Sequence, residues 1–330
     1  MAKTLVIAEK PSVARDLAGA LPGAFKQSKD KTSLVGDDYV VTWAVGHLVG
    51  LAEPDAYDPK LKKWRFADLP IIPDKFKLVP NDSKSEKQLK AIHKLIKDDE
   101  IETIVNACDA GREGELIFAY VYETAKAKKP VKRLWLNSMT KSAIADAFER
   151  LRNGDEMESL EAAARSRSEA DWVVGMNATR AASIRLRAAF DGAVSLGRVQ
   201  TPTLALVARR EVEIRNFKPE PYWLVEASFA AEGERVYSGR YMGGKRIAED
   251  EAAKIVEETT GKPGDITKLE KKEEREQPQL LYDLTSLQRH ANTLYGFSAR
   301  RTLAAAQRLY EEHKAITYPR TNSRYLTGDL

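Results

Sequence analysis

Strand-like and helix-like hydrophobic patterns alternate along the first part of the chain. Residues 4–8 (TLVIA) form a short apolar run, and Pro11 suits the first turn of the helix that follows. The same order returns between residues 103 and 126, and a further strand is expected over 131–138 before another helix. Strands that alternate with helices predict a largely parallel sheet, interrupted by an ordered surface excursion within 36–82.

From about residue 156 the pattern becomes helical and rich in alanine, up to Ala189. Two glycines interrupt it, and Pro202 opens another helix that ends near Arg215. The stretch SLGRVQTPT (195–203) is therefore predicted as a flexible connection between two helices.

The chain becomes β-rich after about residue 220. Two alternating runs with a Gly-rich turn predict paired strands, followed by a helix at 250–260, a further strand and a charged linker at 270–276. Amphipathic helices are expected at 283–294 and 298–313. These patterns divide the chain into four parts: 1–152, 153–218, 219–278 and 279–330.

Composition limits the class of protein. The 330 residues exceed one ordinary domain, and 43% hydrophobic with 31% charged residues is typical of a soluble globular protein. The one cysteine, Cys108, excludes a disulfide framework and suits a reducing compartment. No apolar stretch approaches the roughly 18 residues of a membrane span, so we expect a cytoplasmic protein without membrane contact.

The small positive net charge of +4 is concentrated locally. Between Trp172 and Arg210 there is one acid, Asp191, against six arginines: Arg180, Arg185, Arg187, Arg198, Arg209 and Arg210. Because the planar guanidinium suits phosphate, this segment predicts nucleic-acid contacts, with a solvated helix face as the alternative. Trp64 and Trp172 are candidate stacking platforms for bases, although each is also typical of a packed core.

Carboxylates follow two of the predicted strands. Glu9 ends the first strand, and Asp109, Glu113 and Glu115 lie in the string CDAGREGE after a later one. The carboxyl ends of parallel strands meet at one edge of a sheet, and oxygen ligands suit Mg²⁺, which favours phosphoryl transfer. The alternative is a set of solvated loop acids that pair with Lys10 and Arg112.

Glycine spacing is informative at two places. Gly111 and Gly114 leave room for a backbone to approach a phosphate. Residues 239–245 have the GxxxxGK spacing, but Arg246 replaces the required Ser or Thr, and the run lies in a hairpin pattern. We therefore expect no ATP site.

Tyr318 directly precedes Pro319, with Arg320 two positions on. A phenol with a pKa near 10 needs cationic surroundings to act as a nucleophile, and Arg320 supplies one such charge. A Tyr–Pro pair by itself more often marks simple packing.

Six strings occur in order along the chain: AEKPS (8–12), GHL (46–48), CDAGREGE (108–115), ADWVVGMNATR (170–180), SLGRVQTPTL (195–204) and ITYPRTNS (316–323). Together they resemble the type IA DNA topoisomerases, in particular the bacterial topoisomerase III group. The resemblance implies a multidomain α/β and α+β fold: a Rossmann-like Toprim domain (1–152), a helical single-strand-binding segment (153–218), a β-rich arch segment (219–278) and the start of a helical domain carrying a catalytic tyrosine (279–330).

The resemblance also implies roles for individual residues. Tyr318 would attack a phosphodiester and form a 5′-phosphotyrosyl link, and Arg320 would hold the scissile phosphate. Glu9 would share metal binding with proton transfer to the leaving 3′ oxygen, and Lys10 would stabilise the transition state.

Metal and DNA contacts follow from the same resemblance. Glu9, Asp109 and Glu113 would bind Mg²⁺, with weaker affinity because Gly111 stands where many relatives have a second aspartate. The DNA contacts implied by the resemblance are Arg180, Ser195, Leu196, Gly197, Arg198, Val199, Gln200 and Arg320. Trp64 and Trp172 remain candidate contacts on the stacking argument given above.

The implied activity is ATP-independent, Mg²⁺-assisted cleavage and religation of one DNA strand, relaxing or decatenating DNA in the nucleoid. Because the family continues well beyond its tyrosine, we expect this chain to be incomplete for strand passage and to associate with a chain that supplies the missing half. The alternatives are a non-catalytic single-strand-binding fragment and a Toprim nuclease or primase-like enzyme.

Overall fold

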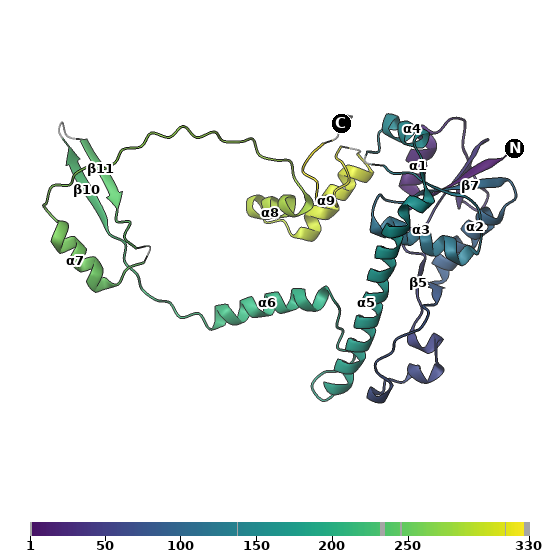
Figure 1. The fold of residues 1–330 in the computed structure, drawn as a ribbon, viewed down its shortest axis with the longest axis horizontal. Helices are drawn as coiled ribbons and strands as arrows, with labels where there is room; N and C mark the ends of the chain where they lie inside the picture. Colours follow the sequence, from purple (N-terminus) through teal and green to yellow (C-terminus); the bar gives the residue numbers. More distant parts are fainter. Residues whose placement is uncertain (1, 137, 232–234, 245, 314, 327–330) are drawn as a thin grey trace. The chain divides into compact units, whose positions relative to one another are not determined.

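The computed structural model describes residues 2–136, 138–231, 235–244, 246–313 and 315–326. It divides into two compact units, Met1–Thr201 with Leu280–Leu330, and Pro202–Gln279 (Figure 1). The first unit contains the sheet and the tyrosine segment, and the second contains a small hairpin.

A seven-stranded sheet, in the order β2-β3-β4-β1-β7-β8-β9, is the centre of the first unit. Strand β1 (Lys3–Ala8) lies between β4 (Tyr39–Trp43) and β7 (Ile101–Ala107), parallel to both, and β8 (Val131–Arg133) continues the parallel set. The largely parallel sheet predicted from the sequence is confirmed. Antiparallel strands extend both edges: β2 (Lys26–Gln27), β3 (Ser33–Val35) and β9 (Arg152–Asn153).

Helices pack on both faces of this sheet because its central strands are apolar on both sides. Leu5 and Ile7 of β1 face a core shared with α2 (Ser83–Lys97) and α3 (Arg112–Ala125). The alternate residues Val6 and Ala8 face α1 (Pro11–Ala20) and α4 (Lys141–Glu149). Strand β1 is thus buried on both faces, and the loop that follows it is held rigidly.

The excursion after β4 packs beside the long helix α5 (Glu158–Arg185). It contains β5 (Val49–Leu51) paired with β6 (Leu78–Pro80). Asn177 of α5 fixes this excursion, since its amide exchanges two hydrogen bonds with the backbone of Ile71 (2.6 and 2.8 Å). Three short 3-10 helices complete the described excursion: η1 (Pro54–Ala56), η2 (Pro59–Lys62) and η3 (Phe66–Asp68). A further one, η4 (Gly154–Met157), leads into α5.

The tyrosine segment of the first unit follows two helices, α8 (Leu284–Tyr295) and α9 (Ala299–Glu311). Ser298 caps α9 by accepting a hydrogen bond from the Arg301 N–H (3.2 Å). The backbone N–H of Leu284 donates to the Thr321 carbonyl, which joins the start of α8 to the chain after Tyr318.

The second unit holds the antiparallel pair β10 (Glu226–Ala231) and β11 (Arg235–Arg240) and the helix α7 (Glu249–Thr259). Helix α6 (Gln200–Arg215) begins before Pro202 and crosses from the first unit into the second. The further strand expected before residue 270 is wrong: the described residues from 262 to 282 contain none, because no neighbouring strand pairs with them. Among the described helices, none is both long and apolar enough to cross a membrane.

Candidate active site at the carboxyl ends of the parallel strands

The loops after β1 and β7 bring two carboxylates together. Burial raises the pKa of Glu9, and the neighbouring Asp109 carboxylate raises it further. Lys10 opposes this effect, with its Nζ atom 3.6 Å from Oε1 of Glu9. Glu9 and Asp109 therefore lie close together at this edge of the sheet, as the sequence predicts.

Tyr318 lies over the same edge. Its ring centroid is 5.6 Å from the Lys10 ammonium, and its ring packs edge-on against Tyr310 at 5.5 Å. Burial is the main reason that the pKa of Tyr318 is raised. The charges of Asp109 and Glu9 raise this pKa further, while those of Lys10 and Arg320 lower it. A half-buried phenol thus lies within electrostatic reach of two acids and two cations.

Glu113 points to a different neighbour. Its Oε2 atom lies 3.1 Å from Nε2 of His47, which follows β4, and both side chains are substantially exposed. Within the described part of the chain, no group of three or more His, Cys, Asp or Glu side chains is arranged to hold a metal ion. Two carboxylates, Glu9 and Asp109, are a donor set that Mg²⁺ accepts when water and phosphate complete its shell.

The loop carrying His47 has an unusual backbone. Val45 is β-branched and exposed, yet its φ of 58° lies in the left-handed region. The next residue, Gly46, donates its N–H to the Glu9 carbonyl (3.1 Å), and Asn81 donates to the His47 carbonyl (2.7 Å). Such strain persists only where neighbouring contacts fix it, and here they hold His47 beside the acidic loop.

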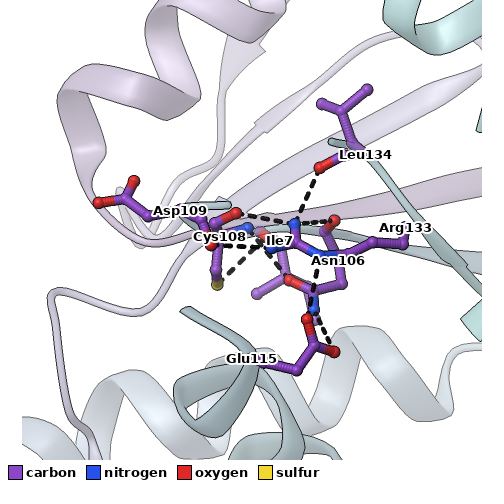
Figure 2. Close-up of polar contacts among 7 residues, drawn as sticks. All are labelled: Ile7, Asn106, Cys108, Asp109, Glu115, Arg133 and Leu134. Atoms are coloured by element: carbon purple, nitrogen blue, oxygen red, sulfur yellow. Dashed lines mark hydrogen bonds and ion pairs between the residues drawn. The ribbon is translucent and has the colours of Figure 1, made fainter. Parts of the chain in front are cut away.

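A buried charge network contacts the Asp109 loop (Figure 2). Arg133, at the end of β8, is 1% exposed, and its Nε donates to Oε2 of Glu115 (3.0 Å). Asn106 donates to the other Glu115 oxygen (3.1 Å). Its Nη1 atom lies within hydrogen-bond distance of three backbone carbonyls, those of Asn106 (3.0 Å), Cys108 (2.8 Å) and Leu134 (2.8 Å), and its Nη2 atom donates to the Asp109 carbonyl (2.8 Å). We call these residues the Arg133 network.

Burial is the larger influence on the pKa of both charged groups in this network. Burial lowers the pKa of Arg133 and raises that of Glu115, while the attraction between the two opposes both effects. Cys108 is buried in the same place, and burial strongly raises the pKa of its thiol. Neither Arg133 nor Asn106 is among the site residues predicted from the sequence. The available signal is an arginine inside an apolar strand-like run, VKRLWL.

Gly114 allows α3 to begin against this loop. A Cβ atom built there would lie 2.2 Å from the Asp109 carbonyl oxygen, so no larger residue fits without a backbone shift. The space that the sequence analysis assigned to an approaching phosphate is occupied by the chain's own backbone. At Gly111, by contrast, a Cβ atom would meet nothing within 4 Å.

Other predicted DNA contacts lie where α5 meets the excursion. Arg180 is buried, donates to the Leu61 carbonyl (2.7 Å), and stacks on Trp64 at 5.3 Å. Trp172 donates its indole N–H to the Ala52 carbonyl (3.0 Å). These contacts account for the three side chains as packing, and their role toward DNA stays a prediction.

The turn between α5 and α6 holds the remaining predicted contacts. Gln200 donates to the Ser195 hydroxyl (2.9 Å), and Arg198 pairs with Asp171 (2.8 Å) at an exposed position. Val199 is exposed. The backbone of the turn is tied down at both of its central residues, Leu196 and Gly197. Hydrogen bonds thus hold the described backbone of this turn, and α6 already begins at Gln200, two residues before the predicted start at Pro202.

Two models of known protein families match this chain, one over its first part and one over the rest. A model of the Toprim domain, a metal-binding domain, matches residues 4–139, and one described as DNA topoisomerase matches residues 155–329. DNA topoisomerase 3 of Bacillus subtilis (strain 168) is 44% identical over 330 residues, which are 100% of this chain and 44% of that protein. The corresponding protein of Bacillus licheniformis is 46% identical, with the same coverage.

Among solved structures, full-length topoisomerase I from Thermotoga maritima shares the fold, with a TM-score of 0.63 and 23% identity over 98% of this chain and 50% of that chain. The chain thus spans less than half the length of the curated relatives that it matches. Because the DNA topoisomerase model covers more than half of the sequence, and the Toprim model covers most of the remainder, the chain belongs to the type IA DNA topoisomerase family.

Proposed function

We propose that this chain carries out the cleavage and religation chemistry of a topoisomerase III-like enzyme on single-stranded DNA. The Tyr318 oxygen attacks a backbone phosphorus, a 5′-phosphotyrosyl bond forms, and the bond to the 3′ oxygen breaks. The phosphotyrosyl bond conserves the energy of the phosphodiester, so religation is the reverse reaction and needs no ATP. The observation that carries this proposal is the placement of Tyr318 over Lys10 and beside Glu9 and Asp109.

The neighbouring side chains suit the proton transfers of this reaction. The leaving 3′ oxygen needs a proton, and the raised pKa of Glu9 makes it a better proton donor near neutral pH than an ordinary glutamate. The phenol must lose its proton to solvent water, and the positive charges of Lys10 and Arg320 favour that loss against the effect of burial. Arg320 is exposed and can also bind the scissile phosphate.

A divalent cation, Mg²⁺ in our proposal, would be held by Glu9 and Asp109, with Glu113 joining after it leaves His47. When bound, the cation would neutralise the charge between phosphate and carboxylates. The chain's own contribution is to hold the two acids close together, at the edge of the sheet, before metal or DNA arrives.

DNA binding is proposed to extend from this site along α5 and the turn that follows it. Arg198 and Val199 are exposed there and accessible to a strand. Trp64 and Phe66 each stack with an arginine of α5, an arrangement that also suits a nucleobase. We retain the four-part division at 152, 218 and 278, and a cytoplasmic location on the nucleoid, as parts of this proposal.

Strand passage, and therefore relaxation or decatenation, is proposed to require the remaining part of the enzyme, on this polypeptide or on an associated chain. Helix α6 supports this proposal, because its apolar side chains are uncovered: Leu204 and Leu206 are each 67% exposed and Phe217, just beyond it, is 73% exposed. Exposed apolar surface of this kind is typical of an interface.

The test is a suicide oligonucleotide, from which the strand beyond the cut dissociates. Wild-type chain with Mg²⁺ should accumulate a covalent adduct, and Tyr318→Phe should form none. Tyr325→Phe is the matched control, because Tyr325 is exposed and close in sequence. An adduct in Tyr318→Phe contradicts the proposal.

The same assay separates the alternatives. Mg²⁺-dependent cleavage without an adduct, unchanged in Tyr318→Phe, would indicate a Toprim nuclease. Salt-sensitive binding without cleavage would indicate a single-strand-binding fragment.

A further inference from the structure

Asp109 lies in a loop and belongs to neither a strand nor a helix. It follows β7, whose last residue is Ala107, and precedes α3, which begins at Arg112. The position of its carboxylate therefore depends on what holds the intervening backbone. Asn106 contributes one contact by accepting from the Cys108 N–H (3.1 Å), and the Asp109 backbone hydrogen-bonds to the Glu9 carboxyl. The carbonyl groups of the loop are held by a side chain of another strand, since Arg133 donates to those of both Cys108 and Asp109 at 2.8 Å (Figure 2).

We infer that Arg133 is a positioning residue of the cleavage site: through these two hydrogen bonds it fixes the Asp109 loop so that the Asp109 carboxylate lies beside Glu9. The inference rests on the proposed function for its catalytic meaning. Its structural part concerns only the geometry of the metal-binding carboxylates.

The chemistry of arginine suits this task. A guanidinium presents its N–H donors in a planar fork, and here it reaches one carboxylate and four carbonyls at once, with the two Nη1 hydrogens shared among three of the carbonyls. A lysine has three donors on one compact ammonium, so it cannot reach Glu115 and the four carbonyls together. Glu115 fixes the fork from the opposite side, and Asn106 fixes Glu115.

The close packing at Gly114 makes this support effective. The first turn of α3 approaches the Asp109 carbonyl so closely that no Cβ atom fits between them. The loop is thus held between the guanidinium and the helix start, and loss of either contact frees it to move.

The neighbouring strand offers a matched control. Arg152 of β9 pairs with Arg133 in the sheet register, and both guanidinium groups stack on Trp135, at 5.0 and 5.2 Å. Arg152 is exposed, and of its described contacts none reaches the Asp109 loop. Arg152→Met removes an arginine and one ring contact from the same strand pair without touching the proposed support.

Removing Arg133 alone also leaves Glu115 buried without its cation, which can unfold the chain. The informative variant is therefore Arg133→Met with Glu115→Leu, which replaces the buried ion pair by apolar side chains and can keep the fold. Arg133→Lys is the conservative companion. The full chain is used throughout.

Three measurements are made on each variant: the melting temperature, hydrogen exchange of a peptide spanning residues 107–112, and Mg²⁺ affinity by calorimetry. In the double variant we expect a melting temperature near that of the wild type, faster exchange in the peptide, and Mg²⁺ affinity lower by about 10- to 100-fold. Arg133→Lys should also show faster hydrogen exchange in the peptide and a lower Mg²⁺ affinity than the wild type. Arg152→Met should match the wild type in both.

Wild-type exchange and affinity in a folded double variant would overturn the inference and leave Arg133 a purely structural role. Hydrogen exchange needs neither metal nor DNA, so it decides the point even for a chain that binds Mg²⁺ too weakly to measure. If the wild-type chain forms no covalent adduct while the double variant still loses loop protection, the proposed function fails and the positioning role stands.

Discussion

Glu113 and Glu115 stand two positions apart in the first turn of α3, yet they belong to two different regions. Glu115 is 5% exposed and is held by Arg133 and Asn106, whereas Glu113 is exposed and meets His47 at 3.1 Å. Because helix geometry turns successive residues by about 100°, one acid points into the sheet and the other toward solvent. The string CDAGREGE therefore contains a buried carboxylate, Glu115, that holds Arg133, and an exposed carboxylate, Glu113, that is free to change partners in our proposal.

The largest expected effect tests the buried region. Glu115→Ala leaves the guanidinium of Arg133 buried without a counter-ion, so the free energy of unfolding should fall by about 3–5 kcal/mol in urea denaturation. Glu113→Ala is the matched control and should change it by about 1 kcal/mol or less, because exposed pairs contribute little. Equal losses for the two variants would contradict the distinction.

A smaller effect is expected at Gly114, where the first turn of α3 closely approaches the Asp109 carbonyl. Gly114→Ala places a methyl group against the Asp109 carbonyl and should cost about 1–3 kcal/mol, together with weaker Mg²⁺ binding measured by calorimetry. Gly111→Ala, where the added atom meets open space, should cost about 1 kcal/mol or less and leave Mg²⁺ binding unchanged. Identical behaviour of the two glycine variants would show that the loop adjusts freely.

Gly111→Asp sharpens the comparison by adding a carboxylate to the exposed side. The backbone there is extended, with φ of 173°, which an aspartate adopts readily, and aspartate is a favourable N-cap for α3. We expect Mg²⁺ affinity to rise about tenfold, or about 1.4 kcal/mol. Gly111→Asn is the control that adds the shape without the charge. Unchanged affinity in both would place this position outside the metal site.

The smallest effect concerns His47. His47→Ala removes an exposed partner of Glu113, so the free energy of unfolding should change by about 0.2–1 kcal/mol. The freed carboxylate should raise Mg²⁺ affinity by less than Gly111→Asp does. In the background of Glu113→Gln the gain should disappear. A gain that persists there would mean that Glu113 is not the group released.

Much of this fold is predictable from the sequence because hydrophobic periodicity reports local burial. The pattern predicts β1, β7 and α3 within one or two residues at each end, and it predicts the Ser298 cap. It overextends the strand at 131–138, which ends at Arg133, since its partner β9 has only two residues. The amphipathic helix α2 was missed, although Leu89, Ile92 and Ile96 form a buried stripe along it.

The candidate site likewise contains residues whose positions could be predicted from the sequence and residues whose positions could not. Chain position alone indicates that Glu9 and Asp109 follow parallel strands, so their proximity could be expected. The role of Arg133 could not, because its partner Glu115 lies on a different element and a charged residue in a short strand usually faces solvent. The pairing of Glu113 with His47 likewise depends on a left-handed Val45, which no local pattern predicts.

Cys108 lies within the Arg133 network, with its thiol directed at the Ile7 carbonyl and its pKa strongly raised by burial. A maleimide added to the folded chain should therefore react only when the backbone under Asp109 opens, because a buried, protonated thiol is inert. Since the sequence contains no other cysteine, the alkylation rate reports that local opening without any engineered label.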